Sequence, residues 1–273
     1  MHCAIIYDFD GTLAKGNCAE HGLMPALGID DSEKFWSEVK NKTKNDDADE
    51  ISMYLLQLMN KAKEINNTNL LSKNKLYEYG KSIPLYNGVE NWFPLINRYA
   101  ADNGIGLSHY IISSGLEEMI MGTPISKYFK KIFACRYVYD ESDLPIWPAI
   151  SINYTTKTQF LFRINKGIEN CYDNSGINRF IEPSKRSIPF SNMIYLGDGD
   201  TDIPAMKTVK YQGGHSIAVF DNDKWNDEKT QNKVQKLISE ERSDYVVPAD
   251  YTEHSQLTVS VKGILQLIKR RYL

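Results

Sequence analysis

The first residues able to do chemistry are two aspartates near the start of the chain. Residues 8–12 read Asp-Phe-Asp-Gly-Thr and follow a short apolar run that is typical of a buried strand. Asp8 and Asp10 are expected to converge where the strand ends and the chain turns at Gly11. Two close carboxylates raise the pKa of one of them, whereas a divalent cation neutralises both and leaves one oxygen free to attack. The pair indicates chemistry on an anionic substrate.

Three further polar groups are predicted at strand ends or at the start of a helix. They are Ser113-Ser114-Gly115, Lys157, and residues 197–202, which read Gly-Asp-Gly-Asp-Thr-Asp. In open α/β sheets, ligands bind beyond the carboxyl ends of the strands, where the strand order reverses. We therefore expect one crevice to collect all these groups with the aspartate pair.

The residue types suggest a role for each group in phosphoryl transfer. Asp8 is the expected nucleophile, since a carboxylate can form an aspartyl-phosphate that divides a difficult hydrolysis into two steps. Asp10 is the expected general acid and base. Ser113, Ser114 and Lys157 are expected to bind the phosphate, because a transferring phosphoryl group spreads negative charge over its oxygens.

The loop at residues 197–202 suggests a magnesium site. Mg²⁺ prefers carboxylates, a backbone carbonyl, waters and a phosphate oxygen. Asp8, Asp198 and the backbone carbonyl of Asp10 are the predicted ligands, and Asp202 either ligates the metal or orients its neighbours. Asp200 is expected to face solvent. Alone, such a loop is also compatible with a structural Ca²⁺ site or a polar turn.

The order of predicted elements indicates an α/β fold with a doubly wound, mostly parallel, Rossmann-like sheet. Helical periodicity without a strand candidate runs through residues 16–87, which we interpret as an inserted helical cap. Residues 1–15 and 88–273 form the predicted core. Residues 168–191 are interpreted as an irregular excursion. The predicted core strands after the first lie at 107–112, 131–135, 193–196, 216–220 and 245–247, and the helices at 157–166, 203–207 and 256–270.

Composition and charge restrict the possible partners. The chain has 273 residues and a net charge of −3 without a Lys/Arg block, so neither nucleic acid nor an anionic membrane surface is an expected partner. The four cysteines lack CxxC spacing and are interpreted as free thiols in a reducing cytosol. No apolar run approaches membrane-spanning length, so we expect a cytoplasmic protein. The five histidines lack metal-ligand spacing.

In their order along the chain, these motifs resemble those of the haloacid dehalogenase-like hydrolase superfamily. The matching residues are Asp8-Phe9-Asp10-Gly11-Thr12, Ser113, Lys157 and the loop at 197–202. The helical insertion is similar to the cap of the phosphoserine phosphatase-like branch. The resemblance implies Mg²⁺ and the roles given above, with Asp198 and Asp202 as the acids of the magnesium site.

The resemblance also limits the chemistry. Dehalogenases of the superfamily lack the second aspartate, so Asp10 favours phosphoryl transfer. Phosphoserine phosphatases carry a glutamate nine residues after the nucleophile, where this chain has Asn17, and Glu20 is out of register. Lys166 is an alternative to Lys157 as the phosphate-binding lysine.

The sequence therefore predicts a Mg²⁺-dependent phosphomonoester hydrolase that acts on a small phosphorylated metabolite. A phosphotransferase or phosphomutase would use the same residues with a different acceptor. A non-catalytic module that binds metal and phosphate is the alternative from another class, against which the pairing of Asp8 with Asp10 argues.

Overall fold

The computed structural model describes residues 1–273 and has one seven-stranded sheet with the strand order β4-β3-β2-β1-β5-β6-β7. All neighbouring strands are parallel except β3 and β4. The predicted α/β fold with a mostly parallel sheet is confirmed. The strands are β1 (His2–Tyr7), β2 (Gly106–Leu116), β3 (Phe129–Tyr139), β4 (Pro145–Ile150), β5 (Met193–Gly197), β6 (His215–Phe220) and β7 (Tyr245–Pro248).

Strand β1 lies in the middle of the sheet because it is apolar on both faces. All its residues after His2 are buried, as parallel strands covered on both sides require. The chain proceeds from β1 to β2 and β3 on one side, and later returns to place β5 on the other side of β1. The strand order thus reverses at β1, and the site predicted beyond its carboxyl end lies at that switch point.

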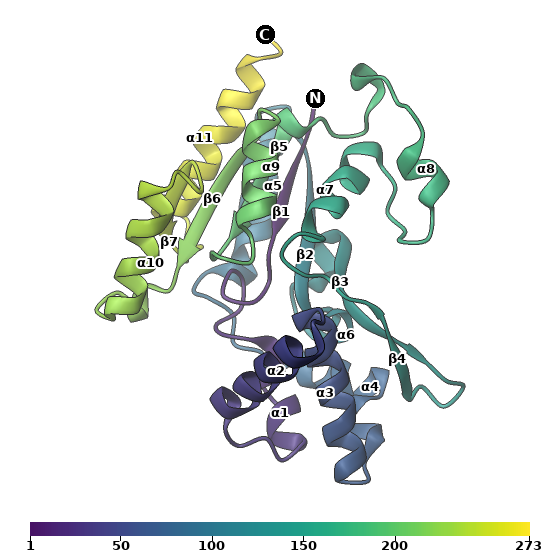
Figure 1. Cartoon of the computed structure of the whole chain (residues 1–273). Coiled ribbons are helices and arrows are strands. Elements are labelled where there is room, and N and C mark those ends of the chain that lie inside the picture. The colour runs from purple at the N-terminus through teal and green to yellow at the C-terminus, as the bar shows by residue number, and fades with distance from the viewer.

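Helices cover the sheet in two layers. Helices α5 and α11 contact each other on one face, and α7 and α9 contact each other on the other (Figure 1). None of the helices is long and apolar enough to cross a membrane. The helices of the core are α5 (Val89–Asp102), α6 (Glu117–Gly122), α7 (Lys157–Lys166), α8 (Asn174–Asn178), α9 (Ile203–Tyr211), α10 (Glu228–Ser239) and α11 (Gln256–Arg270).

Residues 16–87 contain helices and no strand, as the periodicity predicts. They form a group of helices beyond the end of the sheet, near the β3–β4 hairpin (Figure 1). The N-cap aspartates Asp31 and Asp49 accept hydrogen bonds from Lys34 N and Ser52 N, which fixes where the two long helices begin. The helices of this segment are α1 (Leu23–Ala26), α2 (Ser32–Asp46), α3 (Glu50–Glu64) and α4 (Lys73–Gly80).

The structure differs from the sequence prediction in several places. Strand β2 continues through Ser113 to Leu116, with a register shift against β3 after Ile112, so Ser113 lies within the strand and does not follow it. Strand β4 and helices α6 and α10 were not predicted. The 168–191 excursion contains the short helix α8.

The hairpin of β3 and β4 connects the core to the helical segment. The hydroxyl of Tyr137 donates to the backbone oxygen of Leu55 at 2.8 Å. The side-chain amide of Asn153, in the loop after β4, donates to the N-cap Asp49. These contacts fix the start of α3 against the loop that leads to α7. Both loop and helix therefore take part in forming one cavity.

Candidate active site

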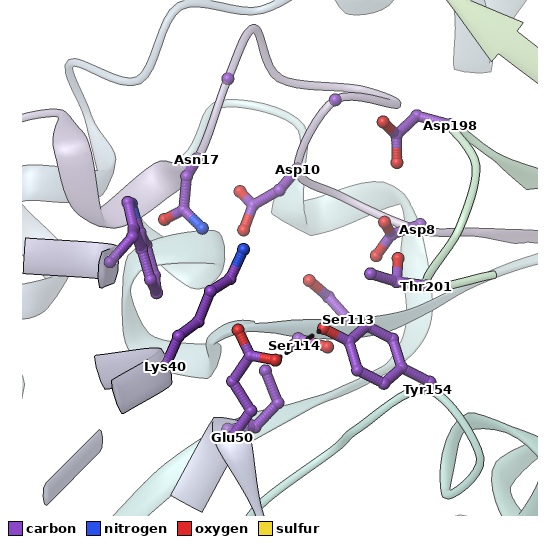
Figure 2. Close-up of a pocket in the computed structure, with 14 residues that line it drawn as sticks. Asp8, Asp10, Asn17, Lys40, Glu50, Ser113, Ser114, Tyr154, Asp198 and Thr201 are labelled. Carbon is purple, nitrogen blue, oxygen red and sulfur yellow. Dashed lines mark hydrogen bonds between the residues drawn. The ribbon is translucent and has the colours of Figure 1, made fainter. Parts of the chain in front are cut away.

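A cavity of about 370 Å³ lies between the carboxyl ends of the central strands and helices α2 and α3. Figure 2 shows Asp8, Asp10 and Asp198 directed into it from the core. Gly11 makes this convergence possible: its φ is +71°, and a Cβ atom there would lie 2.8 Å from Cγ of Asp198. Glycine adopts this conformation without steric cost. The first chain turn can therefore approach the loop after β5.

Asp8 is buried at the end of β1 and paired with Lys157. The Lys157 Nζ atom lies 2.9 Å from Oδ1 of Asp8 and 2.7 Å from Oδ1 of Asp202. Lys157 is the first residue of α7, so the start of that helix delivers the ammonium group. Oδ2 of Asp8 has no hydrogen-bond partner in the protein, and Asp8 lines the cavity. This oxygen is free to meet a ligand.

The surroundings of Asp8 shift its pKa in opposite directions. Burial and the carboxylate of Asp202 raise the pKa of Asp8 well above its ordinary value, and the Lys157 ammonium opposes this increase. Burial lowers the pKa of Lys157, but Asp202 and Asp8 outweigh it, so the net shift is upward. Lys157 therefore stays charged. A dication beside Asp8 would complete the neutralisation of the buried acids.

Asp202 is fully buried and both of its carboxylate oxygens accept hydrogen bonds. Oδ1 accepts from Lys157 and from the hydroxyl of Tyr195, each at 2.7 Å, and Oδ2 accepts from the backbone N–H of Asp198 at 3.1 Å. Gly197 lies so close that a Cβ atom there would be 2.5 Å from Cγ of Asp202. Asp202 thus holds the lysine and the loop together. This arrangement corresponds to the orienting role, one of the two roles expected for it.

The donor set matches a magnesium site. Asp8, Asp198 and Asp202 each offer a carboxylate oxygen, and these oxygens lie within 4.8 Å of one another. Asp198 is half-buried, and its Oδ2 accepts from Nζ of Lys233 on α10 at 2.8 Å. Burial raises the pKa of Asp198, against the effect of Lys233. Hard oxygen ligands with excess negative charge are what Mg²⁺ prefers.

Asp10 is held by the segment that leads into the helices. Its Oδ1 accepts from the backbone N–H of Cys18 at 2.8 Å, and its Oδ2 lies 3.6 Å from the Cys18 thiol sulfur. Burial raises the pKa of Asp10 to about 6, although both contacts with Cys18 favour the charged form. Both protonation states are therefore accessible near neutral pH, as a general acid and base requires.

The two serines differ in what their hydroxyl groups contact. Ser113 Oγ accepts from the backbone N–H of Gly115 at 3.0 Å, which leaves its own O–H free to donate toward the cavity. Ser114 Oγ donates to the backbone oxygen of Ile152 at 2.6 Å. Both residues line the cavity. The Ser114 hydroxyl therefore donates within the protein, whereas the Ser113 hydroxyl can donate to a ligand.

The two candidate lysines are clearly separated. Lys157 contacts Asp8, whereas Lys166, at the other end of α7, donates to the backbone oxygens of Ile177 and Arg179 in the 168–191 excursion. Lys157 is buried and does not itself line the cavity, so its predicted phosphate contact stays a prediction. Asp200 is exposed, as expected.

Several residues at the site were not predicted from the sequence. From the core come Tyr195 and Lys233, which contact the aspartates. The opposite wall of the cavity contains side chains from the helices and from the loop before α7. Two of them, Trp36 and Lys40, stand four residues apart on α2, and this spacing was the sole local signal in the sequence for any residue of this wall. These wall residues are Trp36, Lys40, Glu50, Ile51 and Tyr154.

Comparison with known proteins places this geometry in a known fold. No family model matches the chain. An uncharacterized protein of Borreliella burgdorferi is 29% identical over 93% of both chains. A haloacid dehalogenase family hydrolase from Salmonella enterica serovar Typhi superposes with a TM-score of 0.57 at 16% identity, over 96% of this chain and 70% of that one. A phosphoserine phosphatase, solved as a phospho-aspartyl intermediate analogue, superposes with a TM-score of 0.54 at 17% identity, over 96% and 98%. The chain has the haloacid dehalogenase-like hydrolase fold, which it shares with phosphoserine phosphatase over nearly the whole length of both chains.

Proposed function

We propose that the protein is a Mg²⁺-dependent phosphomonoester hydrolase that works through an aspartyl-phosphate on Asp8. The observation that carries the proposal is the state of Asp8. One of its oxygens is fixed by the buried Lys157, and the other is free at the floor of a cavity that also contains Asp10 and Asp198. The motif order and the shared fold support the same reaction class.

In the first step, Oδ2 of Asp8 attacks phosphorus, and the bond between phosphorus and the ester oxygen breaks. Asp10 gives its proton to the departing oxygen. In the second step, Asp10 takes a proton from water, which attacks the phosphorus and releases Asp8 and inorganic phosphate. A pKa of about 6 suits Asp10 to both transfers.

The remaining residues position these groups and balance their charge. Asp8, Asp198 and the backbone carbonyl of Asp10 would hold Mg²⁺, which when bound neutralises the anionic oxygens of the substrate. Asp202 keeps Lys157 and the Asp198 backbone in place through hydrogen bonds to both of its oxygens. The free Ser113 hydroxyl donates to a phosphate oxygen.

The direct test is phosphate release from a panel of phosphomonoesters with and without Mg²⁺. We expect metal-dependent turnover that falls by at least about 10⁴-fold in Asp8→Asn, because the nucleophile is lost. The matched control is Asp200→Asn, which makes the same chemical change at an exposed position of the site loop. Turnover that persists in Asp8→Asn would exclude Asp8 as the nucleophile.

A second measurement tests the covalent step. Borohydride reduces an acyl phosphate but leaves a free carboxylate intact. Enzyme quenched during turnover and treated in this way should contain a reduced residue at position 8, detected by peptide mass spectrometry. Reduction at another aspartate, or at none during active turnover, would contradict the proposed intermediate.

A further inference from the structure

The cavity contains one basic residue among the fourteen that line it. That residue is Lys40, and the acids that share the cavity are Asp8, Asp10, Glu50 and Asp198. The three aspartates belong to the proposed phosphoryl-transfer site. Lys40 comes from the opposite wall, on helix α2, and Figure 2 shows its ammonium group directed into the cavity. A cation in this place can pair with an acid of the protein or with an anionic ligand.

Lys40 has no such partner within the protein. It forms no hydrogen bond, and no carboxylate oxygen lies within 4.0 Å of its Nζ atom. Lys42, two residues later on the same helix, donates to Oε1 of Gln57 at 3.0 Å. Lys233 and Lys157 are both paired with acids of the site. The ammonium group of Lys40 is therefore available to a ligand in the cavity.

Trp36 lies one helical turn before Lys40 and faces the same cavity, since residues four apart share one face of a helix. Its indole N–H donates to Oε1 of Glu20 at 2.9 Å, which fixes the ring. Glu20 itself does not line the cavity. The α2 face thus offers a fixed aromatic surface beside a free cation.

Asn17 adds a second donor on this side of the cavity. Its Oδ1 accepts from the backbone N–H of Ala19 at 2.9 Å, which leaves its NH₂ group free. Figure 2 shows the side chains of Asn17 and Lys40 directed toward the same part of the cavity as that of Asp10. On the same wall as Lys40, Glu50 accepts from the hydroxyl of Tyr154 at 3.2 Å. Apart from the core residues, the free donors described here are therefore the NH₂ group of Asn17 and the ammonium group of Lys40.

We propose that Lys40 and Asn17 bind a second anionic group on the leaving-group part of the substrate. The proposal rests on the proposed function, because it takes the ester phosphate to lie at Asp8. The substrate class is then a small phosphomonoester whose alcohol part carries a carboxylate or another phosphate. A cavity of about 370 Å³ suits a small metabolite.

The test compares three esters of similar size: glycerol 3-phosphate, 3-phosphoglycerate and propane-1,3-diol bisphosphate. They differ in whether the far group is neutral, a carboxylate or a phosphate. We expect wild-type kcat/KM to favour at least one of the two anionic esters by roughly tenfold over glycerol 3-phosphate. Lys40→Gln should reduce this ratio to about one, mainly through KM. The anionic ester whose kcat/KM advantage disappears in Lys40→Gln shows whether the second anionic group is a carboxylate or a phosphate.

The matched control is Lys44→Gln, which removes the same charge from an exposed position one turn later on α2 and outside the cavity. It should keep the wild-type ratio. An equal loss of this kcat/KM ratio in both lysine variants would mean that the preference depends on net charge and not on a site at Lys40. That result would overturn the proposal. Equal kcat/KM for the three esters in the wild type would overturn it as well.

A binding measurement separates failure of this inference from failure of the proposed function. Calorimetry on Asp8→Asn gives Kd for the same esters without turnover, and Lys40→Gln in that background should weaken binding of the favoured anionic ester by roughly tenfold. Equal Kd values for the favoured ester with and without Lys40→Gln, together with intact Asp8-dependent turnover in the wild type, would contradict the Lys40 site alone. Absence of turnover with the Lys40-dependent preference in Kd would contradict the phosphatase and retain the anion site.

Discussion

The two walls of the cavity differ in whether their charged side chains are paired within the protein. On the core wall, Asp8 and Asp202 share the ammonium of Lys157, and Asp198 is paired with Lys233. Lys157 and Asp202 are completely or almost completely excluded from solvent. On the wall formed by the helices, Lys40 is exposed and has no partner. Three acids of the core wall therefore have a cationic partner before any ligand arrives, whereas the cation of the helical wall has no acidic partner.

This difference suggests a division of labour. Groups that must stabilise developing charge act best when they are fixed and shielded from water before the reaction. Groups that distinguish one substrate from another need free donors and acceptors that a ligand can satisfy. We infer that the core wall supplies the chemistry and that the opposite wall supplies the selectivity. Changes in the two walls should therefore alter different quantities.

Among the residues that position the reacting groups, the largest effect is expected at Lys157. Lys157→Met leaves Asp8 and Asp202 buried without their shared cation, which should lower the free energy of unfolding by about 3–5 kcal/mol. We expect kcat/KM to fall at least about 100-fold, because Asp8 loses its fixed position. Urea unfolding and phosphate-release assays measure the two effects.

Lys166→Met is the control for this change. It makes the same substitution on the same helix, at a residue whose partners are two backbone oxygens far from Asp8 in the fold. It should cost about 1 kcal/mol of stability and little activity. A larger loss of activity at Lys166 than at Lys157 would reverse our assignment of the site lysine.

A second effect concerns the packing beneath the core wall. His109 is buried between the hydroxyl of Tyr7 and the side-chain oxygen of Asn97, and burial lowers its pKa to about 3. The unfolded chain takes up a proton below about pH 6.5, whereas the folded chain does not until about pH 3. Stability should therefore fall with acidification, by about 2 kcal/mol between pH 6.5 and pH 5.

Urea unfolding as a function of pH tests this expectation. His109→Gln should flatten the acid slope over that range, whatever its stability at pH 7. His254→Gln changes an exposed histidine and should keep the wild-type slope. An unchanged slope in His109→Gln would assign the acid sensitivity to other groups, the site carboxylates first.

The core wall could largely be predicted from the sequence because its signals are local. Asp8 and Asp10 follow an apolar strand directly, and Asp198 lies in a glycine-containing turn after another strand. Such strand ends meet at one edge of a parallel sheet. The start of α7 at Lys157 also matches the prediction. Short-range pattern and sheet topology together were sufficient for these residues.

The partners of those residues could not be predicted in this way. Lys233 reaches Asp198 from α10, a mostly polar helix with Val234 and Leu237 as its buried residues, so its pattern resembled a surface segment. The edge strand β4 begins at Pro145 and contains Pro148, and proline is confined to edges of sheets or absent from them. The direction of Lys40 depends on how α2 packs, which a local pattern does not specify.

A smaller effect is expected at Lys233, and it tests whether this lysine competes with the metal for Asp198. Its ammonium group occupies one oxygen of Asp198 and would repel a nearby dication. Lys233→Met should therefore tighten Mg²⁺ binding about threefold to tenfold, as measured by calorimetry, because the half-buried pair is worth about 1 kcal/mol. Lys233→Arg should keep the wild-type affinity. Weaker binding in Lys233→Met would mean that the lysine holds Asp198 in its ligating position.

The smallest effect is expected on the opposite wall, at Glu20. Glu20→Gln weakens the hydrogen bond that fixes the Trp36 ring, so the aromatic surface beside Lys40 becomes less ordered. We expect KM for the favoured ester to rise about twofold to threefold with kcat nearly constant, since a partly exposed hydrogen bond to a charged group is worth about 1 kcal/mol.

Glu33→Gln is the control for this change, because Glu33 is an exposed acid in the first turn of α2, the helix that carries Trp36. It should leave KM at the wild-type value. A fall in kcat with unchanged KM in Glu20→Gln would contradict the division between the walls. It would mean that the orientation of Trp36 affects the reacting groups and that the helical wall takes part in the chemical step.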